Sequence, residues 1–458
     1  MTSPSASLDA IFKAYDIRGV YPDQLDESVA RLVGGAFARF TGAPTILVGR
    51  DARPSSPPLA DAFTDGATTA GADVVDLGLA STDLVYFAAG RLDVPAAMFT
   101  ASHNPAQYNG IKLCRAGAAP VGAETGLNDI AALVAAGRIE PGSRRGTVIR
   151  RDLLPEFVDH VRGFVDISAL AGQTIVADTA NGVGGLVVPA VFDGLPITLE
   201  VLYAELDGTF PNHPADPINP ENLVDLQRAV LDRGADAGLA FDGDADRVFL
   251  VDDRAQPLSG SLTTAIVAAS VLRRLPATAS DADRTIVHNL ICSKAVPEIV
   301  RELGGTPVRT RVGHSFIKAV MAETGAAFGG EHSAHYYFRD NYRADSGIIA
   351  ALVVLETLAR SETPLSTLRR PYERYVQSGE INQRVRDPAA VLEAVATAYA
   401  GVSQDRLDGL TVDHGAWWFN LRPSNTEPLL RLNVEAPDAD ACQAHATEVL
   451  TLVAREAD

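Results

Sequence analysis

Cysteine is scarce in this sequence, and the few cysteines are far apart. The 458 residues include three, Cys114, Cys292 and Cys442. An odd number of widely spaced cysteines forms neither a disulfide framework nor a zinc-binding pair, so a reducing compartment is the simpler expectation. The opening residues, MTSPSASLDA, lack the basic and apolar segments of a secretion signal. We therefore expect a cytoplasmic protein.

Blocks of basic residues and long apolar runs are also missing. The net charge is -19, and nucleic-acid binding depends on a basic face that neutralises phosphates. The longest apolar stretch, LTTAIVAASVL at 262–272, is too short to cross a bilayer and predicts a buried helix. We therefore expect neither a nucleic-acid nor a membrane partner, although a few arginines could still bind a small anion.

Two nucleotide-binding motifs are absent as well. The segment NGVGGL at 181–186 follows a strand-like run but lacks the G-x-G-x-x-G spacing of a dinucleotide site. The phosphate-binding loop G-x-x-x-x-G-K-S/T does not occur either. The sequence thus gives no support to a dinucleotide cofactor or to ATP as a substrate.

Alternating strand-like and helical segments are what the sequence does contain. The runs TILVGRD at 45–51 and TIVAD at 174–178 are typical of strands, and ESVARLVGGAFARF at 27–40 has helical spacing. Such alternation predicts an α/β protein, and the length requires more than one domain. Breaks rich in Gly, Pro and Arg predict four domains: 1–150, 151–255, 256–370 and 371–458.

The first loop that could carry chemistry is TASHNP. Ser102 follows the apolar run VPAAMF, so its hydroxyl can project at the C-terminal edge of a strand, where α/β proteins bind ligands. His103 and Lys112 are candidate proton carriers. By itself the loop is also explained by an Asn-Pro turn.

The second loop, FDGDADR, is acidic. Asp242, Asp244 and Asp246 stand at alternate positions between two apolar runs, and carboxylates this close repel one another unless a cation binds. Magnesium suits such oxygen ligands, whereas an EF-hand is excluded because its glycine and glutamate positions hold Arg247 and Asp253. A phosphatase with Asp242 as nucleophile and a plain acidic turn remain open. The same four letters, DADR, recur at 281–284 in a polar run that predicts a solvated loop.

The third and fourth loops offer groups for a sugar and for a phosphate. In FGGEHSAHYYF, Glu331 and Ser333 lie two apart in what we expect to be an extended stretch, so their side chains point the same way. His314, in RVGHSFIK, is a further proton-transfer candidate, whereas no second pair supports a metal at His332 and His335. The loop RPSNTEP provides phosphate donors: Arg422, Ser424, Asn425 and Thr426.

Taken together, TASHNP, DGDADR, GEHSAH and RPSNTEP resemble, in this order, the motifs of the α-D-phosphohexomutase superfamily. The resemblance covers essentially the whole chain and includes YDIRG at 15–19 and GRDARPSS at 49–56. It implies four domains around a central cleft. Three would be related α/β domains with mixed sheets, and the fourth a TATA-binding-protein-like α+β domain acting as a lid.

The resemblance also implies a role for each residue of the four loops. Ser102 would be the phosphorylated serine and, with Asp242, Asp244 and Asp246, would hold Mg²⁺. Proton transfer would involve Lys112 with His103 or His314. The remaining contacts to substrate would come from these residues: Tyr15, Arg18, Arg247, Glu331, Ser333, His335, Arg422, Ser424, Asn425 and Thr426.

The implied reaction is reversible phosphoryl transfer between the 6- and 1-positions of a hexose phosphate, through a hexose 1,6-bisphosphate that also serves as activator. The loops GEHSAH and RPSNTEP favour the phosphomannomutase/phosphoglucomutase branch, with mannose phosphates the expected substrates and glucose phosphates alongside. Glucose-dominant or glucosamine-specific activity remains open. The chain departs from the family pattern at one position. The dual-specificity bacterial members have a lysine before the cysteine of a third-domain segment, whereas this chain has Ile291 before Cys292, with Lys294 nearby.

Two other functions compete with this one. A metal-dependent phosphatase using Asp242 would release phosphate without needing a bisphosphate, and a non-catalytic sugar-phosphate binder would show binding without turnover. The sequence leaves the oligomeric state open between monomer and homodimer.

Overall fold

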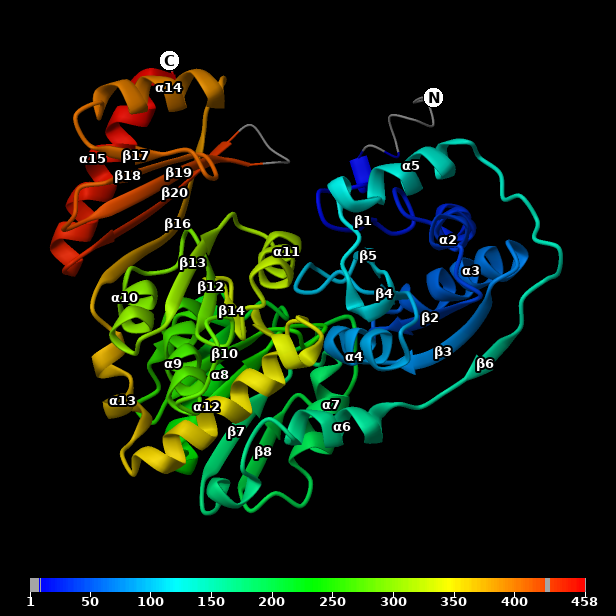
Figure 1. Ribbon diagram of the computed structural model, residues 1–458, viewed down its shortest axis with the longest axis horizontal. Coiled ribbons are helices and arrows are strands. Elements are labelled where there is room, and N and C mark those ends of the chain that lie inside the picture. Colours follow the sequence, from blue (N-terminus) through cyan, green and yellow to red (C-terminus); the bar gives the residue numbers. More distant parts are fainter. Residues whose placement is uncertain (1–7, 9, 425–428, 458) are drawn as a thin grey trace.

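The strands of this chain form four separate sheets. The computed structural model describes residues 8, 10–424 and 429–457, and within them the sheets have six, five, four and five strands in chain order. Figure 1 shows the resulting domains, with the first (blue to cyan) on the right, the fourth (orange to red) at the upper left, and the second and third between them.

The first sheet is mixed and carries the serine loop. Its order is β1-β5-β4-β2-β3-β6, in which β5 runs antiparallel to β1 and β4 while β2 pairs in parallel with β3 and β4. The strands are β1 (Ile17–Val20), β2 (Thr45–Arg50), β3 (Asp73–Leu79), β4 (Ala96–Phe99), β5 (Tyr108–Cys114) and β6 (Val148–Arg150). The helices are α2 (Glu27–Thr41), α3 (Ser56–Thr69), α4 (Thr82–Leu92) and α5 (Leu127–Ala135).

The second sheet places the acidic loop between two buried strands. Its order is β11-β10-β9-β7-β8, with β7 parallel to β8 and β9 and with β10 antiparallel to β9. The strands are β7 (Thr174–Asp178), β8 (Thr198–Leu202), β9 (Ala237–Phe241), β10 (Val248–Asp252) and β11 (Pro257–Leu258). The helices are α6 (Leu154–Arg162), α7 (Gly184–Phe192) and α8 (Val224–Arg233).

The third sheet is mixed and the fourth is entirely antiparallel. The third contains β12 (Thr285–Asn289), β13 (Thr306–Thr310), β14 (Phe328–Gly330) and β15 (Tyr336–Phe338), with helices α9 (Gly260–Arg273), α10 (Ala295–Glu302), α11 (His314–Thr324), α12 (Gly347–Ser361) and α13 (Leu365–Leu368). The fourth contains β16 (Val376–Arg384), β17 (Ser403–Asp405), β18 (Leu410–Asp413), β19 (Trp418–Pro423) and β20 (Leu429–Ala436), with helices α14 (Pro388–Ala398) and α15 (Ala439–Ala457).

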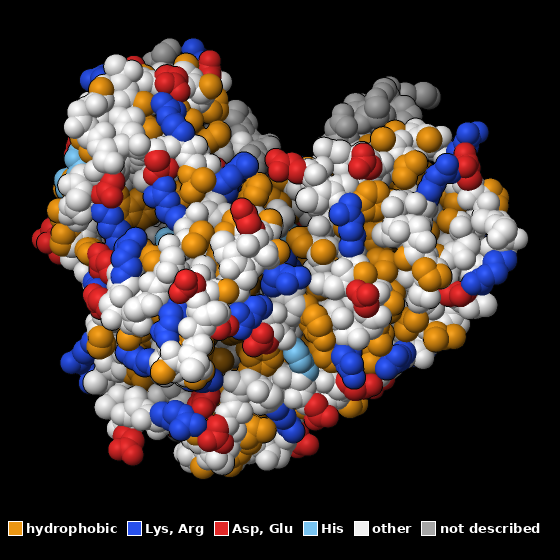
Figure 2. Space-filling view, viewed as in Figure 1, with side chains coloured by type: hydrophobic (Ala, Val, Ile, Leu, Met, Phe, Trp, Pro, Cys, Tyr) orange, Lys and Arg blue, Asp and Glu red, His pale blue; other side chains and the backbone are white. Residues whose placement is uncertain are grey.

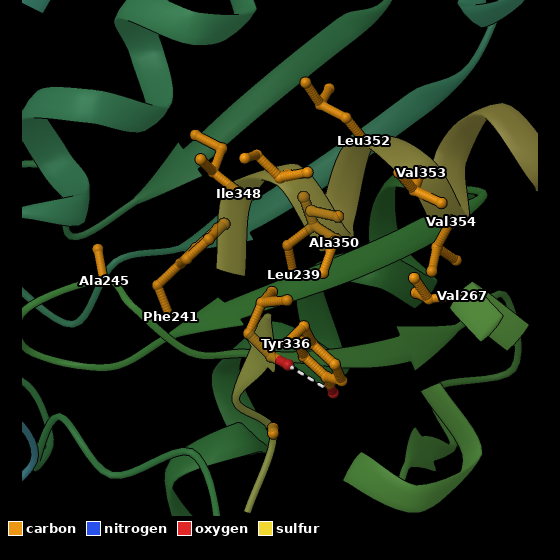
Figure 3. Packing of buried hydrophobic residues seen from close by; sticks show 14 of the residues in the cluster. Leu239, Phe241, Ala245, Val267, Tyr336, Ile348, Ala350, Leu352, Val353 and Val354 are labelled. Atoms are coloured by element: carbon orange, nitrogen blue, oxygen red, sulfur yellow. Dashed lines mark hydrogen bonds between the residues drawn. The ribbon is translucent and has the colours of Figure 1, made fainter. Parts of the chain in front are cut away.

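A continuous apolar core joins the second and third domains. Helix α12 packs on β9, with Ala350 next to Leu239 in Figure 3, and Ile348 and Phe241 belong to the same buried cluster. The hydroxyl of Tyr336 donates to the carbonyl of Val248 at 3.3 Å across the same contact. The acidic loop and the third-domain loop therefore belong to one packed block.

The fourth domain has a core of its own, made by β18, β19, β20, α14 and α15. Figure 2 shows the surface hollowed between this domain at the upper left and the first domain on the right. The four-domain α/β arrangement around a cleft, with mixed sheets followed by an α+β domain, is thus confirmed.

The predicted local structure agrees with these elements. The runs at 45–51 and 174–178 contain β2 and β7, the helical pattern at 27–40 is α2, and 262–272 lies in the largely buried α9. Strand β11 pairs with β10 just beyond the predicted boundary at 255, and the four boundaries stay predictions. Over the described residues, no helix is long and apolar enough to cross a membrane.

Candidate active site

Ser102 lies on a loop beyond β4 and faces the acidic loop of the second domain. Its backbone is left-handed, with φ 52°, which is uncommon for a residue other than glycine and is held by surrounding contacts. The Oγ donates to Asp242 Oδ2 at 2.7 Å and accepts from Arg247 Nη2 at 3.3 Å. The side chain is almost fully enclosed, with the residue 5% exposed. The hydroxyl is therefore held between a carboxylate and a guanidinium.

The turn between β9 and β10 brings three buried carboxylates together. Ligand oxygens of Asp242, Asp244 and Asp246 lie within 4.8 Å of one another. The Oδ1 atoms of Asp244 and Asp246 are buried with no hydrogen-bond partner among the described residues, so two oxygens are free for a cation. An all-oxygen set of this kind fits Mg²⁺, which binds few protein carboxylates and completes its coordination with phosphate and water.

Lys112 compensates the charge of two of these carboxylates. Its Nζ donates to Asp244 Oδ2 and to Asp246 Oδ2, each at 2.7 Å. Burial alone would lower the pKa of Lys112, but the two aspartates hold that pKa well above its ordinary value. Burial raises the pKa of Asp242 to about 7. Burial also acts to raise the pKa of Asp244, but Lys112 holds it below its usual range.

His103 and His314 both lie inside the site and are uncharged at neutral pH. Burial, followed by the charges of Arg247 and Arg18, puts the pKa of His103 well below its ordinary value. Burial and Lys318 do the same to the pKa of His314. His103 Nδ1 lies 3.4 Å from Ser102 Oγ, so of these two it is the histidine that the structure places at the serine.

Arg18 and Tyr15 come from the start of the first domain and reach different parts of the site. Arg18 Nη1 donates to Asn104 Oδ1 at 2.6 Å and thus contacts the serine loop. The Tyr15 hydroxyl donates to the carbonyl of Val312 at 3.0 Å, next to His314 in the third domain. Arg18 therefore lies against the serine loop, whereas Tyr15 connects the first domain to the third.

The expectation that Glu331 and Ser333 share one face of an extended stretch is wrong. Residues 331–334 form a tight turn between β14 and β15, closed by a bond from the Ala334 N–H to the Glu331 carbonyl at 3.1 Å. The Glu331 carboxylate is buried and accepts from the Tyr337 hydroxyl at 2.6 Å and from Asn289 Nδ2 at 3.0 Å. The alternation rule failed because it applies only to strand backbone.

Sequence reasoning missed a charge network next to the three aspartates. His335 Nδ1 lies 2.8 Å from Asp345 Oδ2 and 3.9 Å from Asp246 Oδ1, and Lys318 Nζ lies 3.0 Å from Asp345 Oδ1. Asp246, His335 and Asp345 form a second group whose ligand atoms lie within 4.8 Å. Lys318 could have been noticed, because it ends the segment RVGHSFIK in which His314 was considered. Nothing in the sequence around Asp345 pointed to a role for that residue.

The fourth loop lies at the end of β19. Arg422 Nη2 donates to Glu380 Oε2 at 2.6 Å, and its Nε is buried without a hydrogen-bond partner among the described residues. Ser424 follows and is partly buried, whereas Asn425 and Thr426 lie outside the described residues. Lys294 lies at the start of α10 in the third domain. Its Nζ donates to Asp413 Oδ1 of the fourth domain at 2.6 Å and so connects the two domains.

A serine hydroxyl between three carboxylates and an arginine, with a second arginine on a separate domain, suits phosphoryl transfer. Comparisons with known proteins agree. The family described as phosphoglucomutase/phosphomannomutase matches in all four of its parts: domain I over residues 9–139, domain II over 155–256, domain III over 259–375 and the C-terminal domain over 380–452.

Full-length relatives support the same assignment. The phosphomannomutase of Salmonella montevideo is 38% identical over 454 residues, covering 96% of this chain and 98% of the relative. The phosphohexose mutases protein of Xanthomonas campestris is 38% identical over 447 residues, with the same coverage. A crystal structure of a family protein from Burkholderia thailandensis is 32% identical, with TM-score 0.88 over 100% of this chain and 99% of that one. The chain belongs to the phosphoglucomutase/phosphomannomutase family, whose mutases are isomerases.

Proposed function

We propose that this protein reversibly interconverts mannose 6-phosphate and mannose 1-phosphate, with glucose phosphates as additional substrates. The observation that carries the proposal is the placement of Ser102 Oγ at 2.7 Å from Asp242 and 3.3 Å from Arg247. The sugar preference draws support from the loops GEHSAH and RPSNTEP and from relatives named phosphomannomutase. Hexose phosphates are thus the partners we expect, in the cytoplasm.

In the resting enzyme Ser102 would carry the phosphoryl group. A sugar hydroxyl attacks the phosphorus, a bond forms to the sugar oxygen, and the bond to Ser102 Oγ breaks. His103, uncharged and 3.4 Å from Oγ, can accept the proton of the attacking hydroxyl and pass it to Oγ. Lys112, whose Nζ bonds Asp244 and Asp246, would place positive charge near the reacting group and is also a candidate for proton transfer, while Arg247 would donate to the phosphoryl oxygens. His314 remains a further candidate for proton transfer.

The product of this step is a hexose 1,6-bisphosphate, and its other phosphate must return to Ser102 for the cycle to close. Arg422 and Ser424, with Asn425 and Thr426, would bind the phosphate that is not reacting. Tyr15, Arg18, Glu331, Ser333 and His335 would contact the rest of the substrate. Bisphosphate that escapes leaves an unphosphorylated enzyme, which is why added bisphosphate would act as an activator.

Asp242, Asp244, Asp246 and a phosphoryl oxygen on Ser102 would hold Mg²⁺. Bound there, Mg²⁺ supplies positive charge that stabilises the phosphoryl oxygens in the transition state. The alternative phosphatase would need Asp242 as a free nucleophile, yet its Oδ2 already accepts from Ser102 Oγ and from Arg247 Nε at 2.9 Å. That geometry favours a serine-based mutase.

The test is turnover of mannose 1-phosphate, glucose 1-phosphate and glucosamine 1-phosphate in parallel, with Mg²⁺ and a trace of hexose 1,6-bisphosphate. We expect mannose-biased or comparable kcat/KM for the first two sugars and almost complete loss in Ser102→Ala. Near-normal activity of Ser102→Ala would rule out the phosphoserine. Phosphate release without isomerisation would favour the phosphatase, and binding without turnover would favour a sugar-phosphate binder.

A further inference from the structure

Arg53 is a fully buried arginine at the base of the serine loop. It follows β2 and is 1% exposed, with no accessible surface on its side chain. A buried guanidinium is costly unless its donors are satisfied. All five of its N–H donors have acceptors within hydrogen-bond distance: Asp51 Oδ2 and the carbonyls of Ser102, Asn104, Pro105 and Tyr108.

Four of these acceptors belong to one segment, residues 102–108, which carries the reacting serine and ends at the first residue of β5. Nη2 donates to the carbonyls of Ser102 at 2.8 Å and Asn104 at 2.7 Å. Nη1 donates to the carbonyls of Pro105 at 2.8 Å and Tyr108 at 3.0 Å. The loop thus turns its carbonyls inward onto a single side chain, which fixes the peptide plane that follows Ser102.

The guanidinium is itself fixed by contacts with Asp51 and Phe210. Asp51 accepts from Arg53 Nε with Oδ2 at 3.0 Å, and its Oδ1 accepts from the Arg53 N–H at 3.0 Å and from Ser56 Oγ at 2.5 Å. Phe210 of the second domain covers the outer side, with its ring centroid 5.0 Å from Arg53 Cζ. The arginine therefore has one orientation available and cannot follow the loop if the loop moves.

Ser102 needs such support because its backbone is in the left-handed region, at φ 52°. That conformation costs a non-glycine residue free energy and persists where the surroundings impose it. Here it directs Oγ toward Asp242. If the carbonyl of Ser102 were released, the residue could relax to a more common backbone conformation and Oγ would leave the carboxylate triad.

We propose that Arg53 is a positioning residue for the reacting serine: by bonding the carbonyls of residues 102–108 it holds Ser102 Oγ where the phosphoryl group is transferred. The inference rests on the proposed phosphoserine function. Arg53 bonds the backbone carbonyl of Ser102 rather than its hydroxyl, and so acts through the backbone. Lysine cannot replace it, because an ammonium has three donors on one atom and lacks the planar fork that reaches four carbonyls at once.

The test compares Arg53→Lys with Arg369→Lys in the full-length protein. Arg369 is a matched control because it is also buried and also bonds carbonyls, those of Gln256 at 3.3 Å and Pro257 at 3.1 Å, away from the serine loop. We expect kcat to fall by roughly 100-fold in Arg53→Lys, the order expected when reacting groups are misplaced by about 1 Å. KM should stay within about threefold of wild type, since the non-reacting phosphate binds elsewhere.

Two further measurements separate positioning from general destabilisation. Each variant is assayed well below its own melting temperature, and the rate of phosphoryl transfer from phosphorylated enzyme to sugar is measured in a single turnover. Arg369→Lys should lose stability without slowing that step. Asp51→Asn is the second variant. Its amide N–H groups face a donor of Arg53 in either orientation, the Nε at the Oδ2 position or the backbone N–H at the Oδ1 position. The change therefore weakens the support of the arginine while leaving the arginine in place. It should slow transfer by about tenfold, less than Arg53→Lys.

The outcomes distinguish this inference from the function on which it rests. If the wild-type protein never carries phosphate on Ser102, both the proposed function and the positioning role of Arg53 are wrong. Normal phosphorylation and turnover in the wild type, together with unchanged kcat in Arg53→Lys, would overturn the positioning role alone. If Arg53→Lys does not fold, a normal single-turnover rate in Asp51→Asn overturns the role equally. A rise in KM with unchanged kcat would instead assign Arg53 to substrate binding and contradict the inference.

Discussion

Ser102 Oγ and Asp242 Oδ2 lie 2.7 Å apart although the residues are 140 positions apart in the chain. The contact joins the first domain to the second and places a hydroxyl against a buried carboxylate. In this position the serine can carry a phosphoryl group next to three aspartates that suit a divalent cation. The chemistry of the protein therefore depends on the packing of one domain against another.

Gly243, inside the acidic turn, should tolerate no side chain. A Cβ at this residue would lie 2.5 Å from the carbonyl oxygen of Ser102, so Gly243→Ala must push the serine loop away from the aspartates. We expect kcat to fall by roughly 10- to 100-fold, measured by steady-state turnover. Gly401→Ala is the matched control, because a Cβ there meets nothing within 4 Å. Equal activities in the two variants would contradict the close approach.

Asp244→Asn should weaken the response to magnesium. It removes a negative charge and one of the two carboxylate oxygens that lack a hydrogen-bond partner among the described residues. We expect the Mg²⁺ concentration for half-maximal activity to rise by about tenfold or more, the order found when groups that tune a metal site are lost. Asp281→Asn changes an aspartate of the second DADR sequence, on an exposed loop, and should leave the response unchanged. An unaltered magnesium response in Asp244→Asn would remove this residue from the metal site.

Arg422→Ala should raise KM far more than it lowers kcat. The side chain is proposed to bind the phosphate that does not react, so its loss weakens ground state and transition state equally. We expect a KM increase of about 10- to 100-fold, the order for losing a charged hydrogen bond, with kcat within about threefold, from initial-rate kinetics on mannose 1-phosphate. Arg431→Ala is the control, because Arg431 contacts the same Glu380 carboxylate, at 3.3 Å. A fall in kcat at constant KM would place Arg422 at the reacting phosphate instead.

His288 should make stability depend on pH. Burial lowers the pKa of His288 to about 4, and the residue is 4% exposed. The unfolded chain binds a proton here below about pH 6.5 while the folded chain stays neutral. The contribution of His288 to the free energy of unfolding is therefore fully present above that pH. It is lost as pH falls toward 4, by at most about 3 kcal/mol.

The measurement is the melting temperature of wild type and His288→Gln between pH 7.5 and pH 5. The variant lacks the titrating group, so the difference between the two proteins should shift in favour of the variant as pH falls. At pH 7.5 the same comparison reports only the packing and hydrogen bonding that the neutral imidazole provides, and it serves as the control. A difference that does not change with pH would show that His288 titrates alike in the folded and unfolded chains.

Much of the architecture follows from local sequence. Alternating apolar runs and helical patterns predicted β2, β7, α2 and α9, because side-chain periodicity reflects which face of an element is buried. The four polar loops were recognisable because each contains residue types whose chemistry is specific in combination, as in the closely spaced Asp242, Asp244 and Asp246. Their order along the chain also carried the resemblance to the α-D-phosphohexomutase superfamily, which implied four domains.

Only the tertiary structure decided which of these groups meet, and how. Glu331 and Ser333 lie in a turn, which the alternation rule for strands could not reveal. Asp345 reaches His335 and Lys318, and Arg53 reaches the carbonyls of the serine loop 49 to 55 positions away. Such contacts depend on the packing of domains and loops that are distant in sequence. The sequence by itself therefore determined which chemical groups are available for the proposed reaction, and the folded chain determined their geometry.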